Sequence, residues 1–215
     1  MKIKIPIPLC SYNNGGLFHM MSKINENKCV IDIECTSFNP WEGRLICIGV
    51  LDVNNGETKV FQDSHEETLL IEFLKYYNKK DFQEIIGYNI TYDTRFIFAK
   101  CLKYSIPANQ FFSAYQTDVM MILKSVKKGF NFNIPGTLDE WSKSVLGRKK
   151  LFHNTEIPEL FQQGRISDII EYNIVDLEIT YELWKRIRSV LYNEIHKKNV
   201  IPQNKQTIHH EEALP

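Results

Sequence analysis

Residues 29–35, CVIDIEC, have the apolar character of a buried β-strand and yet include two acids, Asp32 and Glu34. Side chains two apart in a strand point to the same face of a sheet, so we expect both carboxylates on one face. Two buried like charges repel each other unless a positive group lies between them. The fold must therefore bury this strand and still allow a positive group to reach its acidic face.

The segments that follow predict an antiparallel start to the sheet. Two further strands are expected at residues 45–53 and 58–62, and the turn sequence NNG at 54–56 joins them as a hairpin. Together with the first strand they form a three-stranded antiparallel meander.

The rest of the chain is mainly helical. Apolar spacing predicts a helix over residues 64–80 that begins at a capping box of Ser64 and Glu67, and residues 84–90 predict a fourth, short strand. Later helices are expected at residues 94–106, at 137–147 between Thr137 and Gly147, and at 166–191 as one long helix or a broken pair, with a short strand near Tyr115 leading into another helix. The sequence therefore predicts an α/β fold, a mixed sheet of the meander plus further strands with flanking helices.

The composition predicts a single domain with no net charge. The chain has 215 residues, 43% of them hydrophobic, and equal numbers of basic and acidic residues at 26 each. A neutral chain has no long-range field that indicates a nucleic-acid or membrane partner, so any site for a polyanion has to be local. The five cysteines show no metal-ligand spacing, and neither a membrane span nor a secretory signal is evident, so we expect a soluble, intracellular, cytoplasmic protein with no membrane partner.

The ends of the chain differ from its middle. Residues 1–27 contain KIKIPIPL, whose alternation and two prolines predict an arm or an extra strand. A globular domain is expected over residues 28–199, followed by a flexible polar tail over residues 200–215.

Two more acids lie where they can join the first pair. Asp93 follows the fourth strand at the start of a helix, and Asp176 lies among apolar residues in the last helix. Tyr172 precedes Asp176 by four residues, so the two side chains share one helical face. Taken singly, these residues can be a helix cap or a surface pair. Taken in order, four carboxylates from several elements are what a hydrolase with two bound Mg²⁺ or Mn²⁺ ions requires.

Three segments carry a resemblance to a known family. DIECT, YNITYD and YNIVD resemble the three exonuclease motifs of the DEDD superfamily of 3′-to-5′ exonucleases, over about residues 28 to 192. The resemblance implies a ribonuclease H-like 3′–5′ exonuclease domain over residues 28–199. It implies that four acids bind two Mg²⁺ or Mn²⁺ ions and that a tyrosine orients the attacking water; these are Asp32, Glu34, Asp93 and Asp176 with Tyr172.

The third motif indicates the tyrosine branch of the superfamily. That branch has a tyrosine four residues before the aspartate, as here, whereas the other branch has a histidine at the position of Glu171. The first two motifs look most like the exonuclease domain of family B DNA polymerases. The resemblance implies release of nucleoside 5′-monophosphates from a single-stranded 3′ end, a role in proofreading or repair, and a polymerase or another replication or repair protein as a partner.

Three residues near the motifs are candidates for substrate binding. Thr36 can contact a sugar or phosphate and Phe38 can stack on a base, but a turn cap and a core residue are equal alternatives. Asn89 matches a substrate-side position of the second motif, although an asparagine before a helix is often a simple turn residue. The basic run Arg148–Lys150 can bind a phosphodiester backbone, but the helix dipole also favours bases at a helix end.

Other functions remain open from the sequence. A 3′-to-5′ exoribonuclease of the ribonuclease D type has the same carboxylates, and recognition of a 2′-hydroxyl depends on pocket shape. A catalytically silent nucleic-acid-binding subunit is a further alternative, but such a protein has no physical need for four mutually repelling acids. Chance placement of the acids is the remaining alternative, and it predicts that they do not converge in space.

Overall fold

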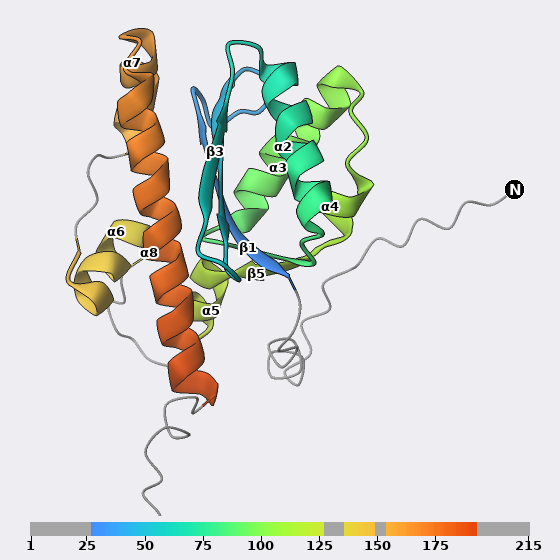
Figure 1. Cartoon of the computed structure of the whole chain (residues 1–215). Coiled ribbons are helices and arrows are strands. Elements are labelled where there is room, and N and C mark those ends of the chain that lie inside the picture. The colour runs from blue at the N-terminus through green and yellow to red at the C-terminus, as the bar shows by residue number, and fades with distance from the viewer. Residues whose placement is uncertain (1–26, 127–135, 149–153, 193–215) are drawn as a thin grey trace, which may run out of the picture.

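A five-stranded mixed sheet lies between two helical layers in the computed structural model, which describes residues 27–126, 136–148 and 154–192 (Figure 1). The strand order is β3-β2-β1-β4-β5, in which β1–β2 and β2–β3 are antiparallel while β1–β4 and β4–β5 are parallel. The strands are β1 (Lys28–Cys35), β2 (Leu45–Asp52), β3 (Thr58–Gln62), β4 (Glu84–Gly87) and β5 (Tyr115–Asp118). The predicted α/β fold with its three-stranded meander is confirmed.

Helices cover both faces of the sheet. One face carries α2 (Glu66–Lys80), α3 (Ile90–Tyr104) and α4 (Asn109–Ser113), and the long helix α8 (Ile166–Tyr192) runs along the other (Figure 1). The remaining helical elements are α5 (Val119–Val126), α6 (Leu138–Trp141), the π-helix η1 (Ser142–Leu146), the 3₁₀-helix η2 (Asn154–Glu156) and α7 (Ile157–Gln162).

The alternation along β1 divides its side chains between the two layers. Cys29, Ile31 and Ile33 join the core formed with α2 and α3, whereas Val30 packs with Leu177 and other residues of α8. Because Asp32 and Glu34 have the parity of Val30, their side of the strand is the one that α8 crosses.

Several predicted element ends need correction. The helix expected from Ser64 begins at Glu66, and its N-cap His65 makes no side-chain cap bond, so the predicted capping box with Glu67 is wrong. Asp63 accepts the N–H of His65 instead, and the carboxylate of Glu66 turns inward to the N–H of Leu45.

The structure also corrects the bounds of two neighbouring elements and shows the form of the last helix. The fourth strand ends at Gly87, three residues early, and the helix after it begins at Ile90 rather than at residue 94. The last helix is one continuous element rather than a broken pair.

The helical segment at residues 137–147 is confirmed. Thr137 and Glu140 form a reciprocal capping box, and Gly147 ends the segment with a φ of 67°, in the left-handed region that favours glycine.

The predicted arm (residues 1–27) and tail (200–215) fall outside the described residues, apart from Asn27, and their boundaries stay predictions. Within the ranges that the structure describes, no helix combines the length and the apolar character needed to cross a membrane.

Candidate active site

Three of the four predicted acids converge between β1 and α8. Asp32, Glu34 and Asp176 each place a carboxylate oxygen so that these atoms all lie within 4.8 Å of one another. Glu34 and Asp176 are buried and Asp32 is half-buried. The predicted placement of the first pair on one sheet face and of Asp176 on the helix opposite accounts for this convergence. The alternative of chance placement predicts that the acids do not converge, and these three do.

Asp93 lies beside this group rather than within it. It occupies the first turn of α3 and is buried, and its Oδ1 accepts the backbone N–H of Ile33 at 3.1 Å. Burial and the nearby charge of Asp32 raise the pKa of the Asp93 carboxyl well above its usual value. Asp93 therefore contacts β1 from α3, the helix that follows the parallel strand β4.

Tyr172 lies one turn before Asp176 on α8 and is 1% exposed. Burial, followed by the charges of Asp176 and Glu34, raises the pKa of its phenol. The phenol also hydrogen-bonds to Asp176. It therefore stays protonated near neutral pH and serves as a hydrogen-bond donor at the edge of the acidic group.

The chain matches the family model of the RNase H superfamily over residues 29–188. It belongs to that superfamily. The RNase H superfamily protein is also 30% identical over 171 residues to an uncharacterised protein of Methanocaldococcus jannaschii, a match that covers 74% of this chain and 93% of the relative.

A solved structure has a similar fold. The family B DNA polymerase from the hyperthermophilic archaeon Pyrobaculum calidifontis superposes with a TM-score of 0.63 at 15% sequence identity. The match covers 76% of this chain but only 24% of the polymerase chain. At that identity the likeness shows the fold, and the RNase H superfamily protein corresponds to about a quarter of the polymerase.

The acidic group fits a divalent cation. Hard ions such as Mg²⁺ and Mn²⁺ prefer oxygen ligands, and three carboxylates with oxygens within 4.8 Å of one another provide them from β1 and α8. A cation there also removes the repulsion between the acids. Fold and acidic group together support a nuclease-type enzyme that acts on nucleic acid with the help of divalent metal.

The predicted substrate residues differ in their surroundings. Thr36 has the turn role that was one of its alternatives, since its Oγ1 accepts the N–H of Arg44 at 2.8 Å. Phe38 is 74% exposed, so the core alternative is wrong for it; its ring meets the edge of Tyr92 at a centroid distance of 6.0 Å. Asn89 is exposed with a φ of 62° and makes no side-chain cap bond, so its amide is not used as a helix cap.

Arg148 makes ion pairs that neither of its two predicted roles included. Its guanidinium lies 3.0 Å from Glu178 and 3.2 Å from Glu182 on α8, so it holds the segment after η1 onto that helix. Lys149 and Lys150 lie outside the described residues.

Two residues that sequence reasoning missed complete the surroundings of Asp32. Asn173 of α8 is fully buried and donates from Nδ2 to Oδ2 of Asp32 at 2.8 Å, and Gly49 of β2 lies directly opposite Asp32 in the antiparallel ladder. A polar residue on the turn that carries Tyr172 and Asp176 was the available signal for Asn173, whereas Gly49 had none.

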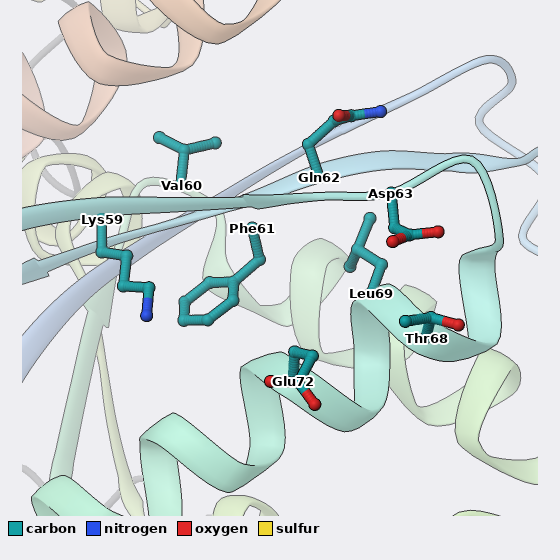
Figure 2. A pocket seen from close by; sticks show the side chains of 8 residues that line it. All are labelled: Lys59, Val60, Phe61, Gln62, Asp63, Thr68, Leu69 and Glu72. Carbon is teal, nitrogen blue, oxygen red and sulfur yellow. The ribbon is translucent and has the colours of Figure 1, made fainter.

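A shallow pocket elsewhere has no part in this site. Figure 2 shows it between strand β3 and helix α2, where Lys59 and Phe61 face Thr68 and Glu72. None of the predicted site residues lines it.

Proposed function

We propose that the protein is a metal-dependent 3′-to-5′ exonuclease of the tyrosine branch, which hydrolyses the terminal phosphodiester of single-stranded DNA and releases nucleoside 5′-monophosphates. One observation carries the proposal. Asp32, Glu34 and Asp176 place carboxylate oxygens within 4.8 Å of one another, and Tyr172 shares the helix face of Asp176 one turn away.

The four acids have the role of holding the metal. Asp32, Glu34 and Asp176 would bind a first Mg²⁺ or Mn²⁺ ion, and Asp93 beside Asp32 would take part in binding a second. When bound, such ions supply positive charge for the phosphate and for the water that attacks it. The neutral net charge of the chain is consistent with this, because the metals rather than a basic surface attract the phosphate.

Tyr172 is assigned to the attacking water. Its phenol remains protonated because burial and the neighbouring carboxylates raise its pKa. While its O–H donates to Asp176, its oxygen can accept a hydrogen bond from a water and so orient that water for in-line attack, and the acids keep their ligand role.

The 3′ end is proposed to meet the loop after β1. Phe38 exposes its ring beside Tyr92 and can stack on the terminal base. The hydroxyl of Thr36 accepts from Arg44 but keeps its own proton to donate to a sugar or phosphate oxygen. The exposed side-chain amide of Asn89, at the start of the helix that carries Asp93, can donate to the substrate.

Digestion of 5′-labelled single-stranded DNA and RNA of matching sequence, with Mg²⁺ or Mn²⁺, tests the proposal. We expect a DNA ladder that shortens from the 3′ end, is lost in Asp32→Ala and is slowed in Tyr172→Phe. Glu72→Ala, which removes an exposed acid of α2, is the matched control and should digest like the wild type. A ladder on RNA alone would identify an exoribonuclease, and no ladder on either polymer would contradict the proposal.

A further inference from the structure

A buried amide contacts one of the proposed metal ligands. Asn173 is 0% exposed, and its one described side-chain hydrogen bond runs from Nδ2 to Oδ2 of Asp32 at 2.8 Å, between residues 141 positions apart. Its Oδ1 is buried and has no hydrogen-bond partner among the described residues. Burying an amide with an unsatisfied oxygen costs free energy, so a simple packing role is better filled by an apolar side chain.

The orientation of this amide is determined by its neighbours. A carboxylate oxygen accepts hydrogen bonds, so the amide must turn Nδ2 toward Asp32. Oδ1 then points at the backbone of β2, where a Cβ atom on Gly49 would lie only 1.9 Å from it. Gly49 is the residue paired with Asp32 in the β1–β2 ladder. Residues of β1, β2 and α8 thus lie close together here, and only glycine at position 49 leaves room for the Asn173 amide.

We propose that Asn173 is a positioning residue for Asp32, and that Gly49 provides the space that this role requires. The inference rests on the proposed function, in which Asp32 binds metal. A neutral donor fixes the rotamer of the carboxylate. Unlike a lysine or arginine, it adds no positive charge that would compete with a cation, and unlike an aspartate it adds no repulsion.

Calorimetric titration of the metal-free full-length protein with Mn²⁺ tests the role of Asn173. Asn173→Ala and the smaller change Asn173→Ser should each bind Mn²⁺ about 10–100-fold more weakly than the wild type, the range found for residues that orient metal ligands. Leu183→Ala is the matched control, because Leu183 is a buried core residue of the same helix. It should lower the melting temperature without weakening Mn²⁺ binding.

The outcomes separate this inference from the proposed function. If the wild type binds Mn²⁺ and folded Asn173 variants bind it equally well, the positioning role is overturned and the proposed function stands. If the wild type binds no Mn²⁺, the metal site fails and the positioning role fails with it.

A double-mutant cycle tests the role of Gly49. Gly49→Ala should weaken Mn²⁺ binding in the wild-type background, because its methyl group displaces the amide of Asn173. In the Asn173→Ala background the added Cβ still lies 2.6 Å from Cδ1 of Leu177, but the amide that contacts Asp32 is absent, so the same change should weaken Mn²⁺ binding much less. Additive losses of affinity would overturn the role given to Gly49.

Discussion

Glu66 and Glu34 are both buried carboxylates, yet the groups around them are of opposite kinds. Glu66 of α2 has Nζ of Lys100 at 3.0 Å, the N–H of Leu45 at 2.6 Å and the hydroxyl of Tyr104 at 2.7 Å. Glu34 instead belongs to a group of three carboxylates whose oxygens lie within 4.8 Å of one another. Donors contact the first acid, and two other carboxylates lie close to the second.

The difference separates a structural acid from the acids of the candidate site. Burial acts to raise the pKa of Glu66, but the bonds from Leu45, Tyr104 and Lys100 outweigh it and lower the pKa. Burial and the charge of Asp32 raise the pKa of Asp93. The protein itself completes the Glu66 site, whereas the acidic group becomes more stable when it takes up a cation.

The two regions are also connected. Lys100 donates to the carbonyl of Gly43 as well as pairing with Glu66, and Glu66 binds the first residue of β2. The loop between β1 and β2 therefore contacts a buried ion pair, and this loop presents Phe38 beside Tyr92. A complete internal site thus supports the loop proposed to bind the substrate.

The largest expected effect is the loss of stability when the Glu66 site loses Lys100. Lys100→Met leaves Glu66 buried without its nearest cation, and we expect a loss of about 3 kcal/mol in the free energy of unfolding. This is the lower end for a broken buried pair, because Lys103 remains 3.5 Å from Glu66. Urea denaturation measures it. Lys75→Met, which breaks an exposed pair with Glu72, is the control and should cost less than about 1 kcal/mol. Equal losses in the free energy of unfolding of both variants would contradict the view that the buried pair of Glu66 and Lys100 differs from an exposed pair.

The acidic group should gain stability when a cation is added, whereas the Glu66 site should lose stability when its cation is removed. Mn²⁺ at about 100 times its dissociation constant should stabilise the wild type by about 2.7 kcal/mol, and Glu34→Gln should lose this gain. In metal-free buffer the same variant should be at least as stable as the wild type, because one repelling charge is gone. Thermal unfolding with Mn²⁺ and with EDTA measures both quantities.

Glu84→Gln is the control for this experiment. It removes a buried carboxylate that pairs with Lys28, so it should lower stability and retain the Mn²⁺ gain. If Mn²⁺ stabilised Glu34→Gln as much as the wild type, the acidic group would not be the metal site.

These contrasts show what the sequence could and could not predict. The two-residue spacing of Asp32 and Glu34 and the four-residue spacing of Tyr172 and Asp176 are local, so periodicity alone predicted their faces. The contact of Asn173 with Gly49 depends on where α8 crosses β2, which no local pattern contains.

Glu66 illustrates the same limit. It is the first residue of α2, where the sequence predicted a capping box of Ser64 and Glu67 and gave Glu66 no role. Its inward turn depends on Lys100 and Leu45, which lie in other elements. Local spacing therefore predicted which faces carry the acids, whereas the residues that contact those acids required the tertiary structure.

The smallest expected effect is a pH dependence whose sign differs between the two regions. The folded-state pKa of Glu66 is lowered, so its stabilising bonds are fully present above the pKa of an unfolded glutamate, about 4.3. They are lost as the pH falls through the folded-state pKa. The stability difference between the wild type and Glu66→Gln should therefore stay constant from pH 7 to roughly pH 5 and shrink below about pH 4. Glu72→Gln should show little difference at any pH.

Asp93 should give the opposite trend, because its folded-state pKa is raised. Below the pKa of an unfolded aspartate, about 3.9, the carboxyl is protonated in both states and carries no penalty. As the pH rises above that value, the unfolded chain ionises first, so the wild type loses stability relative to Asp93→Asn until the folded-state pKa is passed. Thermal unfolding in metal-free buffer from pH 4 to pH 7 measures the trend. Parallel pH profiles for the Glu66 and Asp93 variants would mean that both carboxylates have the same electrostatic surroundings, and the distinction between a completed site and a cation site would then fail.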